Sequence, residues 1–186
     1  VLHKVCRNIS TNPIRNMATV GGNLTCRYTW TELGAVMIAL NAQMHFLKDD
    51  GASVIVAAED FFKNAARCEY LFTHVTIKHE PTVKVAYRRV KKTIHVDVPL
   101  LAVCVIANVE TGKWSKVRIG INNGTTFAQR DSSLEEFLNT SQSSADLGTK
   151  ALEHLTKDIY DTRSTDYKQH MFRVSLRQCI EEMAKA

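Results

Sequence analysis

The chain has 186 residues, of which 45% are hydrophobic and 23% are charged, proportions typical of a folded globular protein rather than a disordered one. Its 24 Lys and Arg residues against 19 Asp and Glu residues leave a net charge of +5, and the scattered cations disfavour nucleic-acid binding. The longest apolar run, residues 98–107, is about half as long as a membrane-spanning helix, which excludes a membrane span.

Hydrophobic spacing and turn signals predict the elements of the first half in chain order. An i, i+4 apolar stripe predicts a helix over residues 1–9, which Asn12-Pro13 ends. A compact segment with two adjacent glycines follows. A helix is then expected over residues 35–42, with its first turn starting at Thr31. A hairpin of two strands, a short amphipathic helix and a further strand come next, over residues 43–47, 52–57, 59–64 and 70–77.

The second half begins after a boundary at His79-Glu80-Pro81. A cationic strand is expected over residues 83–90, and the apolar segment 98–109 is either a strand or a buried helix. The turn at residues 110–113 before a strand over 116–121 favours an antiparallel hairpin. The remainder is helical, with Leu134, Phe137 and Leu138 on one face, a helix over 145–155, and an amphipathic helix over 166–183 with Met171, Val174, Cys179 and Met183 mostly on one side. Strands followed by helices predict an α+β fold with two domains, residues 1–80 and 81–186.

The cysteines and the start of the chain indicate the compartment. The five cysteines are odd in number, widely spaced and never in a Cys-x-x-Cys pair, which predicts buried free thiols in a reducing compartment, the cytoplasm. The histidines, such as His74 and His79, have no metal-binding spacing, so no metal site is expected. No signal peptide precedes the first folded segment. Because the chain opens with Val1 inside an apparent helix, we expect a fragment or a processed chain.

The segment Ile-Arg-Asn-Met-Ala-Thr-Val-Gly-Gly-Asn, residues 14–23, is the most informative part of the sequence. Gly21 and Gly22 lack a Cβ, so a phosphate or a ring edge can approach their backbone N–H groups closely. Thr19 and Asn23 add a hydroxyl and a carboxamide that can bond a diphosphate or its ribitol. A glycine pair alone is more often a tight turn, so the residues by themselves leave both an anion-binding loop and a plain turn open.

This segment closely resembles the second FAD-binding motif in the flavin subunit or domain of the xanthine dehydrogenase (molybdenum hydroxylase) family. That family includes aldehyde oxidases, carbon monoxide dehydrogenases and nicotinate dehydrogenases. The resemblance spans nearly all of the chain but only the C-terminal part of the family's flavin subunit, including the carbon monoxide dehydrogenase flavoprotein C-terminal domain. It implies the second lobe of the FAD-binding domain, followed by a small antiparallel sheet with a helical C-terminal layer. The further similar segments are residues 35–42, 87–89, 117–120 and 161–167.

The resemblance also implies the residues that contact the cofactor. The flavin-contacting loop would be Thr19, Val20, Gly21, Gly22 and Asn23. Glu32 would bond polar groups of the flavin, although the family usually has the shorter Asp there, and Cys26 replaces a hydroxyl residue. Apolar packing would come from Ile9 and Phe72, and Arg88 would be a cation near the ring system that favours the reduced, anionic flavin. No residue is expected to be catalytic or to bind a metal.

Each of these residues also has a purely structural interpretation. Glu32 is compatible with an acid in the first turn of a helix, where it complements the helix dipole. Ile9 and Phe72 are compatible with ordinary core positions, and Tyr28 and Trp30 with packing. Arg88 is compatible with a solvated cationic strand face that also includes Arg89, Lys91 and Lys92.

The implied function is an FAD-binding electron-transfer component of a molybdenum hydroxylase. Electrons would pass from 2Fe-2S clusters on one partner chain through the flavin to NAD or another acceptor, while molybdopterin on a second partner oxidises the substrate. The family's N-terminal lobe, with a further glycine-rich loop, is missing from residues 1–18, so we expect weak or absent FAD binding by this chain alone. A cofactor-free docking or structural module is the alternative, and a generic phosphate-binding α+β protein is a third interpretation.

Overall fold

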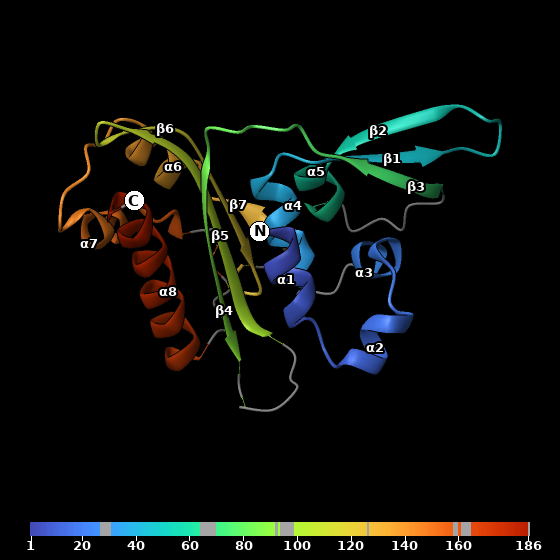
Figure 1. Cartoon of the computed structure of the whole chain (residues 1–186), viewed down its shortest axis with the longest axis horizontal. Helices are drawn as coiled ribbons and strands as arrows, with labels where there is room; N and C mark the ends of the chain where they lie inside the picture. The colour runs from blue at the N-terminus through green and yellow to red at the C-terminus, as the bar shows by residue number, and fades with distance from the viewer. Residues whose placement is uncertain are drawn as a thin grey trace.

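The computed structural model of the chain describes residues 1–26, 31–63, 70–91, 93, 99–125, 127–157, 160 and 165–185. Expectations that concern Tyr28, Trp30, Cys68, Lys92 and the 161–164 part of the last motif lie outside these residues. The described part contains two antiparallel sheets with helices between and beside them (Figure 1). The predicted α+β class is therefore confirmed.

A four-stranded antiparallel sheet forms the second half of the chain. Its strands pair in the order β4 (Lys84–Lys91), β5 (Pro99–Glu110), β6 (Lys113–Asn122) and β7 (Gln129–Arg130). The apolar segment that left strand and helix open is β5, rich in β-branched residues that suit a buried strand. The predicted hairpin is confirmed by a two-residue turn in which Thr111 and Gly112 both have positive φ. Strand β7 was not predicted, because two residues are too few to show a period.

A smaller, three-stranded sheet follows the order β2 (Ser53–Ala57), β1 (Gln43–Leu47) and β3 (Leu71–Thr76). The predicted hairpin between β1 and β2 is confirmed, with Gly51 in its turn at φ 81°. Strand β3 pairs with the other edge of β1 and has a register shift that leaves Thr73 between the paired residues Phe72 and His74. Phe72 thereby keeps its place on the side of the sheet that packs against the core.

The helices agree with the prediction except in the motif region. Residues 14–23 were expected to be one compact segment, but they lie in two short helices separated by an extended Ala18-Thr19 pair. The predicted helix over 145–155 is a short α-helix followed by a 3-10 turn. The helices are α1 (Leu2–Asn8), α2 (Asn12–Met17), α3 (Val20–Thr25), α4 (Glu32–Ala39), α5 (Ala58–Lys63), α6 (Ser132–Asn139), α7 (Leu147–Ala151), the 3-10 helix η1 (Leu152–His154) and α8 (Asp166–Lys185).

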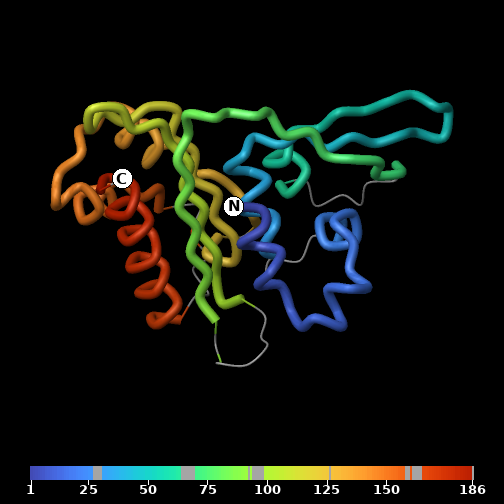
Figure 2. Tube along the Cα trace, in the orientation of Figure 1, coloured from blue at the N-terminus to red at the C-terminus, as the bar shows by residue number. Residues whose placement is uncertain are grey.

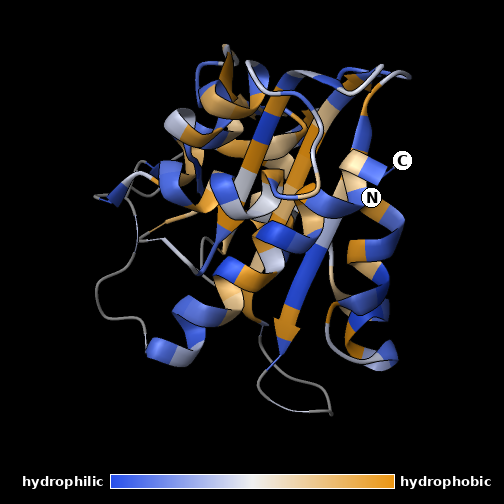
Figure 3. Ribbon diagram, turned by 90° about the vertical axis from the view of Figure 1, so that its left-hand side faces the viewer, coloured by the Kyte–Doolittle hydropathy of each residue, from blue (hydrophilic) through white to orange (hydrophobic). Residues whose placement is uncertain are grey.

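Helices cover the four-stranded sheet on both faces. Alternating residues of β5 point to opposite sides, so that Val103 and Val105 pack with α6 and α8 while Cys104 and Ile106 pack with α4. Figure 1 shows α8, α6 and α7 on one side of this sheet and α1 and α4 on the other. Figure 3 shows apolar residues concentrated in the strands and in the parts of the helices that face them. The sheet therefore separates two hydrophobic cores.

Helix α4 is buried along its whole length and lies against strand β6. Arg118 donates from Nε to the carbonyl of Ala39 at 2.8 Å, and Asn122 donates from Nδ2 to the carbonyl of Thr31. Between these contacts the helix passes so close to Gly120 that a Cβ on this residue would lie 1.8 Å from the carbonyl oxygen of Ala35. Strand β6 thus holds both ends and the middle of the helix.

The buried side of α8 differs from the prediction. Cys179 and Met183 are buried as expected, but Met171 and Val174 are only partly buried, and the core positions around them are Phe172, Leu176 and Ile180. The predicted helical spacing of the apolar residues was correct. The buried face is rotated by about one residue around the helix axis, because apolar residues also occur away from that face.

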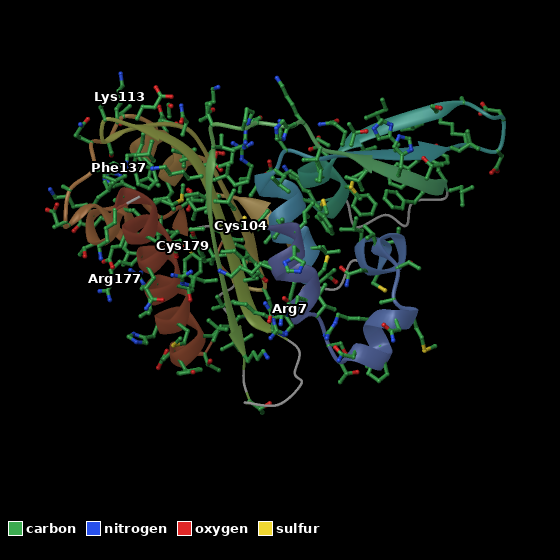
Figure 4. All side chains as sticks on the ribbon, viewed as in Figure 1. Arg7, Cys104, Lys113, Phe137, Arg177 and Cys179 are labelled. Carbon is green, nitrogen blue, oxygen red and sulfur yellow. The ribbon has the colours of Figure 1, made fainter. Side chains whose placement is uncertain are left out.

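The cysteines correct a second expectation. All four cysteines of the described chain are free, but Cys6 and Cys26 are exposed rather than buried. Cys104 and Cys179 are fully buried on the sheet and on α8, as Figure 4 shows. Burial raises the pKa of both buried thiols, to about 12 for Cys179, so neither is a thiolate at neutral pH.

The hydrophobic core on the α4 side of the four-stranded sheet continues across the predicted domain boundary at residue 80. Tyr87, Cys104 and Ile106 of the four-stranded sheet pack in the same cluster as Val36 and Phe46. Figure 2 shows the chain passing from the three-stranded sheet to the four-stranded one along one side of the molecule. The division into domains 1–80 and 81–186 stays a prediction. In the described chain no helix combines the length and apolarity that a bilayer crossing requires, and no group of three or more His, Cys, Asp or Glu residues could hold a metal ion.

Glu80, in this connection, forms a two-point ion pair with Arg118 of β6. The guanidinium donates from Nη2 to Oε2 at 2.9 Å and from Nη1 to Oε1 at 3.3 Å. The hydrogen bonds from Arg118 hold the pKa of Glu80 below its usual value. A carboxyl with a lowered folded-state pKa stabilises the protein above its unfolded pKa and loses this effect as the pH falls through the folded value.

We therefore expect Glu80→Gln to lower the free energy of unfolding by about 1 kcal/mol at pH 7, an effect that shrinks as the pH falls below about 4. Urea denaturation of both proteins at pH 7 and pH 3 measures this. The control is Glu136→Gln, because the side chain of Glu136 is exposed on α6. A difference between Glu80→Gln and the unmodified chain that is the same at both pH values would contradict the expectation.

Candidate functional site

The two motif glycines lie in the first turn of helix α3. Thr19 is the N-cap residue, and its Oγ1 accepts a hydrogen bond from the backbone N–H of Gly22 at 3.0 Å. The first amides of a helix, here those of Val20 and Gly21, have no acceptor within the helix and point out of its N-terminus. The sequence left an anion-binding loop and a plain turn open, and neither Gly21 nor Gly22 has a positive φ. The segment is a helix start, because Thr19 caps it.

The glycines provide space rather than special backbone angles. A Cβ on Gly21 would lie 3.4 Å from Cδ1 of Phe72, so the ring of this β3 residue already lies against the helix. A Cβ on Gly22 would lie 3.1 Å from Oγ1 of Thr19, closer than a side chain normally approaches. Thr25 donates from its hydroxyl to the carbonyl of Gly21 at 2.8 Å and ties the other end of the same turn. The structure therefore brings Thr19, Gly21, Gly22 and Phe72 together.

The side chain of Asn23, in this same turn, contains a buried oxygen atom, Oδ1, without a hydrogen-bond partner in the described chain. A buried carbonyl oxygen without a donor costs roughly 1–3 kcal/mol, so such an atom in a native fold needs an explanation. A ligand hydroxyl or N–H that donates to Oδ1 would remove this cost. The orphaned oxygen is the clearest local sign that the α3 turn is built to meet another molecule.

Apolar side chains near this turn are exposed. Met17 is 86% exposed, and Ile14 and Val20 are each about half exposed. They follow one another along α2 and the start of α3. Exposed apolar residues that gather at one place on a small domain often mark a surface that another molecule covers. Val20 was a predicted contact residue, whereas Ile14 and Met17 were not singled out.

Arg15 shapes the chain just before the turn. Its Nη1 donates to the carbonyls of Ile9 and Ser10 at 2.6 and 2.8 Å, and its Nη2 donates to Asn12. Ser10 has a φ of 48°, so the chain bends sharply there and α2 turns away from α1. Ile9 is partly buried against the core and lies at the start of this bend. Sequence reasoning recognised Arg15 only as part of the motif, because its acceptors are backbone atoms.

Glu32 forms a buried triad with two residues of β4. Oε2 accepts from the hydroxyl of Tyr87 at 3.0 Å, and Oε1 accepts from Nε of Arg89 at 2.6 Å. The Glu32 residue is only 3% exposed. Burial raises the pKa of Glu32 above its usual value, although Arg89 and Tyr87 oppose this, and burial together with Glu32 raises the pKa of Tyr87. Each carboxylate oxygen of Glu32 thus has a partner within the chain and connects α4 to β4.

Arg88 lies apart from the other predicted residues. Its Nη2 forms an ion pair with Glu182 of α8, and its Nη1 donates to the carbonyl of Tyr87 at 3.2 Å. Because side chains alternate along a strand, Arg88 faces α8 whereas Tyr87 and Arg89 face α4. Arg89 is therefore the β4 cation on the same side as Glu32.

The comparisons with known proteins agree with the fold and with the motif. Residues 1–77 match the family model described as the FAD binding domain in molybdopterin dehydrogenase. No curated protein sequence matches the chain significantly. Among solved structures, reconstituted CO dehydrogenase from Oligotropha carboxidovorans has a TM-score of 0.86 at 24% identity, and the alignment covers 100% of this chain and 67% of that one.

Two further structures share the arrangement. Carbon monoxide dehydrogenase from Hydrogenophaga pseudoflava, which lacks the Mo-pyranopterin moiety of its cofactor, has a TM-score of 0.85 at 18% identity over 97% of this chain and 65% of that one. Quinoline 2-oxidoreductase from Pseudomonas putida 86 has a TM-score of 0.84 at 19% identity over 98% and 66%. The chain spans about two thirds of the length of these proteins. At such identities the likeness establishes a shared fold over both halves of the chain.

Proposed function

We propose that the chain is the C-terminal part of an FAD-binding electron-transfer component of a molybdenum hydroxylase, because residues 1–77 match the family model of the FAD binding domain in molybdopterin dehydrogenase. The resemblance predicted from the motif is thus confirmed at the level of the domain family. The observation that carries the proposal is the start of α3, where the first helix amides, which have no acceptor within the helix, lie in the same turn as the orphaned Oδ1 of Asn23.

The residues at this turn fit the chemistry of FAD. Outward-pointing N–H groups at the start of a helix suit the charge of a diphosphate. The Oδ1 of Asn23 suits a donor such as a ribitol hydroxyl. Phe72 and Ile9, both partly buried at the edge of the core, are suited to apolar contact with the cofactor. When bound, FAD supplies the ability to accept and release one or two electrons, which the protein tunes by its contacts.

We place Glu32 and Arg88 in indirect roles. Glu32 would hold the start of α4 through Tyr87 and Arg89, and Arg88 would hold β4 to α8 through Glu182. Both were expected to approach the flavin directly. Their charges are already paired within the chain, so we propose that they support the scaffold around the site.

We further propose the setting that the family resemblance implies. A 2Fe-2S subunit would deliver electrons, a molybdopterin-binding subunit would oxidise the substrate, and NAD or another acceptor would receive the electrons in the cytoplasm. The family's N-terminal FAD lobe would close over the exposed turn formed by α2 and α3. The exposed Met17, Ile14 and Val20 support this, since they lie where such a lobe or the cofactor would cover them.

The alternative is a docking or structural module that retains the fold without cofactor. The internal pairing of Glu32 and Arg88 favours it, because two of the expected polar contacts are directed into the protein itself. The two functions differ in the intact complex. A flavoprotein complex purifies with yellow flavin absorption, whereas a docking module gives a colourless complex that still contains the partner subunits.

The sharpest test is Asn23→Ala in the intact complex. Removing an unpartnered buried oxygen, and replacing Asn by a better helix former, should raise the stability of the isolated chain by about 1 kcal/mol. The same change should lower the affinity of the complex for FAD about tenfold, because a ligand hydrogen bond is lost. Thermal unfolding of the chain and FAD titration of the apo-complex measure the two effects. The isolated chain should bind FAD only weakly.

Asn16→Ala is the matched control, because Asn16 belongs to the same motif but is exposed on α2. It should leave FAD affinity unchanged. If the complex with unmodified chain takes up no FAD, or if Asn23→Ala binds FAD as tightly as the unmodified complex, the proposed role of the α3 turn is wrong. Micromolar binding by the isolated chain would contradict the need for a second lobe.

A further inference from the structure

A cavity of about 270 Å³ lies at the opposite end of the molecule from α3. It opens between η1, the side chains of Leu155, Lys157 and Tyr160, and the first half of α8. Its apolar lining comes from Leu152, Leu155, Tyr160 and Phe172, with Gly124 at one edge. Neither the predicted flavin contacts nor the buried triad of Glu32 forms part of it. The cavity is therefore independent of the candidate flavin site.

The walls of this cavity are held in place by the core. Phe172 is 5% exposed, belongs to the main core cluster and has its ring centroid 5.1 Å from that of Tyr160. Tyr160 donates from its hydroxyl to Oδ2 of the buried Asp131 at 2.8 Å. Thr156 donates from both its N–H and its hydroxyl to the same carboxylate. A cavity whose aromatic wall is fixed in this way is preformed, so little ordering opposes ligand binding.

The rim of the cavity is cationic. Among the described residues that line it, Lys157, Lys168 and Arg173 are cationic and Glu153 is acidic. Within the part of the chain that the structure describes, neither Lys157 nor Arg173 has an ion pair or a side-chain hydrogen bond. Their charges are thus available to a ligand. In a partly enclosed site, such charges attract anions more strongly than they do on an open surface.

We propose that this cavity binds a small aromatic carboxylate. The aromatic body would lie against Phe172 and Tyr160, and the carboxylate would meet Lys157 and Arg173 at the rim. The volume is slightly below the range of about 300–1,000 Å³ typical of drug-sized ligands, which suits a bicyclic ring system with one acidic group. A cationic or neutral ligand would gain nothing from the excess positive charge of the rim.

Binding of 2-naphthoate to the full chain, compared with the neutral 2-naphthamide, tests the proposal. We expect 2-naphthoate to bind with 1:1 stoichiometry and a Kd of about 0.1–1 mM, and the amide at least fivefold more weakly. The double variant Lys157→Gln/Arg173→Gln should weaken acid binding about tenfold but amide binding less than twofold, because only the charge contact is removed. Isothermal titration calorimetry measures these affinities.

The amide serves as the folding control, since a collapsed cavity would lose both ligands equally. Lys113→Gln is the charge control, because Lys113 is an exposed cation at the β5–β6 turn, where Figure 4 labels it. It should leave both affinities unchanged. Equal affinity for acid and amide, equal loss of both in the double variant, a similar loss in Lys113→Gln, or no saturable binding of 2-naphthoate below about 5 mM would each overturn the proposal.

Discussion

Gly120→Ala should destabilise the protein by at least about 3 kcal/mol, more than any other single methyl group we would add. The new Cβ would lie 1.8 Å from the carbonyl oxygen of Ala35 and 2.8 Å from its carbonyl carbon. Both are backbone atoms of the buried helix α4, so the overlap cannot be relieved by rotating a side chain. The helix as a whole would have to move away from β6, and the contacts of Arg118 and Asn122 with its ends would be lost.

Thermal and urea unfolding measure this effect, and the expected loss corresponds to roughly 10 °C in Tm for a chain of this size. Gly124→Ala is the matched control. Its Cβ would meet only side-chain atoms of Ile121 and Phe172, at 3.3 and 3.5 Å, which can shift slightly. We expect it to cost about 1 kcal/mol or less. A Gly120→Ala protein as stable as Gly124→Ala would show that α4 does not lie in direct contact with β6.

Glu32→Met should destabilise the chain by about 3–5 kcal/mol, because it leaves the Arg89 guanidinium and the Tyr87 hydroxyl buried without the carboxylate that they share. The side chain of Arg89 is only 6% exposed, so water does not replace the lost partner. Burial raises the pKa of Glu32, although Arg89 and Tyr87 oppose this. Replacing a buried ion pair with apolar side chains is often neutral for stability, whereas removing one partner is expensive.

The double variant Glu32→Met/Arg89→Met separates these two effects. Replacing both charges with apolar side chains of similar length removes the buried cation together with the carboxylate, so we expect at least about half of the lost stability to return. A double-mutant cycle measured by urea denaturation at pH 7 gives the coupling between the two residues. Additive losses in the two single variants would mean that Glu32 and Arg89 do not interact in solution.

Local patterns were enough for much of the secondary structure. The hairpins β1–β2 and β5–β6 were predicted because turn residues stand between alternating segments, and both turns contain a glycine with positive φ. Helix α8 was predicted from its length and apolar spacing. The α2–α3 break was missed, because Thr19 caps α3 through a contact that is visible only once the chain has turned. Strand β7 was too short to be recognised.

The candidate site was only partly accessible to the same reasoning. The motif identified the residues from Thr19 to Asn23, since a glycine pair with flanking polar residues is a local feature of the sequence. The direction of Arg88 depends on which face of β4 each helix covers, and this is a property of the packed sheet. Sequence order alone made Arg88 and Arg89 equivalent neighbours. Their different partners, Glu182 and Glu32, lie about a hundred residues and more than fifty residues away along the chain.

The amino-acid order thus determined by itself the α+β class, the two hairpins and the glycine motif of an FAD-binding domain, because each depends on neighbours within about ten residues. Only the tertiary structure decided that α4 lies against Gly120, that the Oδ1 of Asn23 has no partner, and that the charges of Glu32 and Arg88 are used within the protein. The physical reason is that close backbone contact and buried charge are set by segments that meet only after folding. Gly120, Asn23, Glu32 and Arg88 therefore have roles that depend on contacts between segments far apart in the sequence.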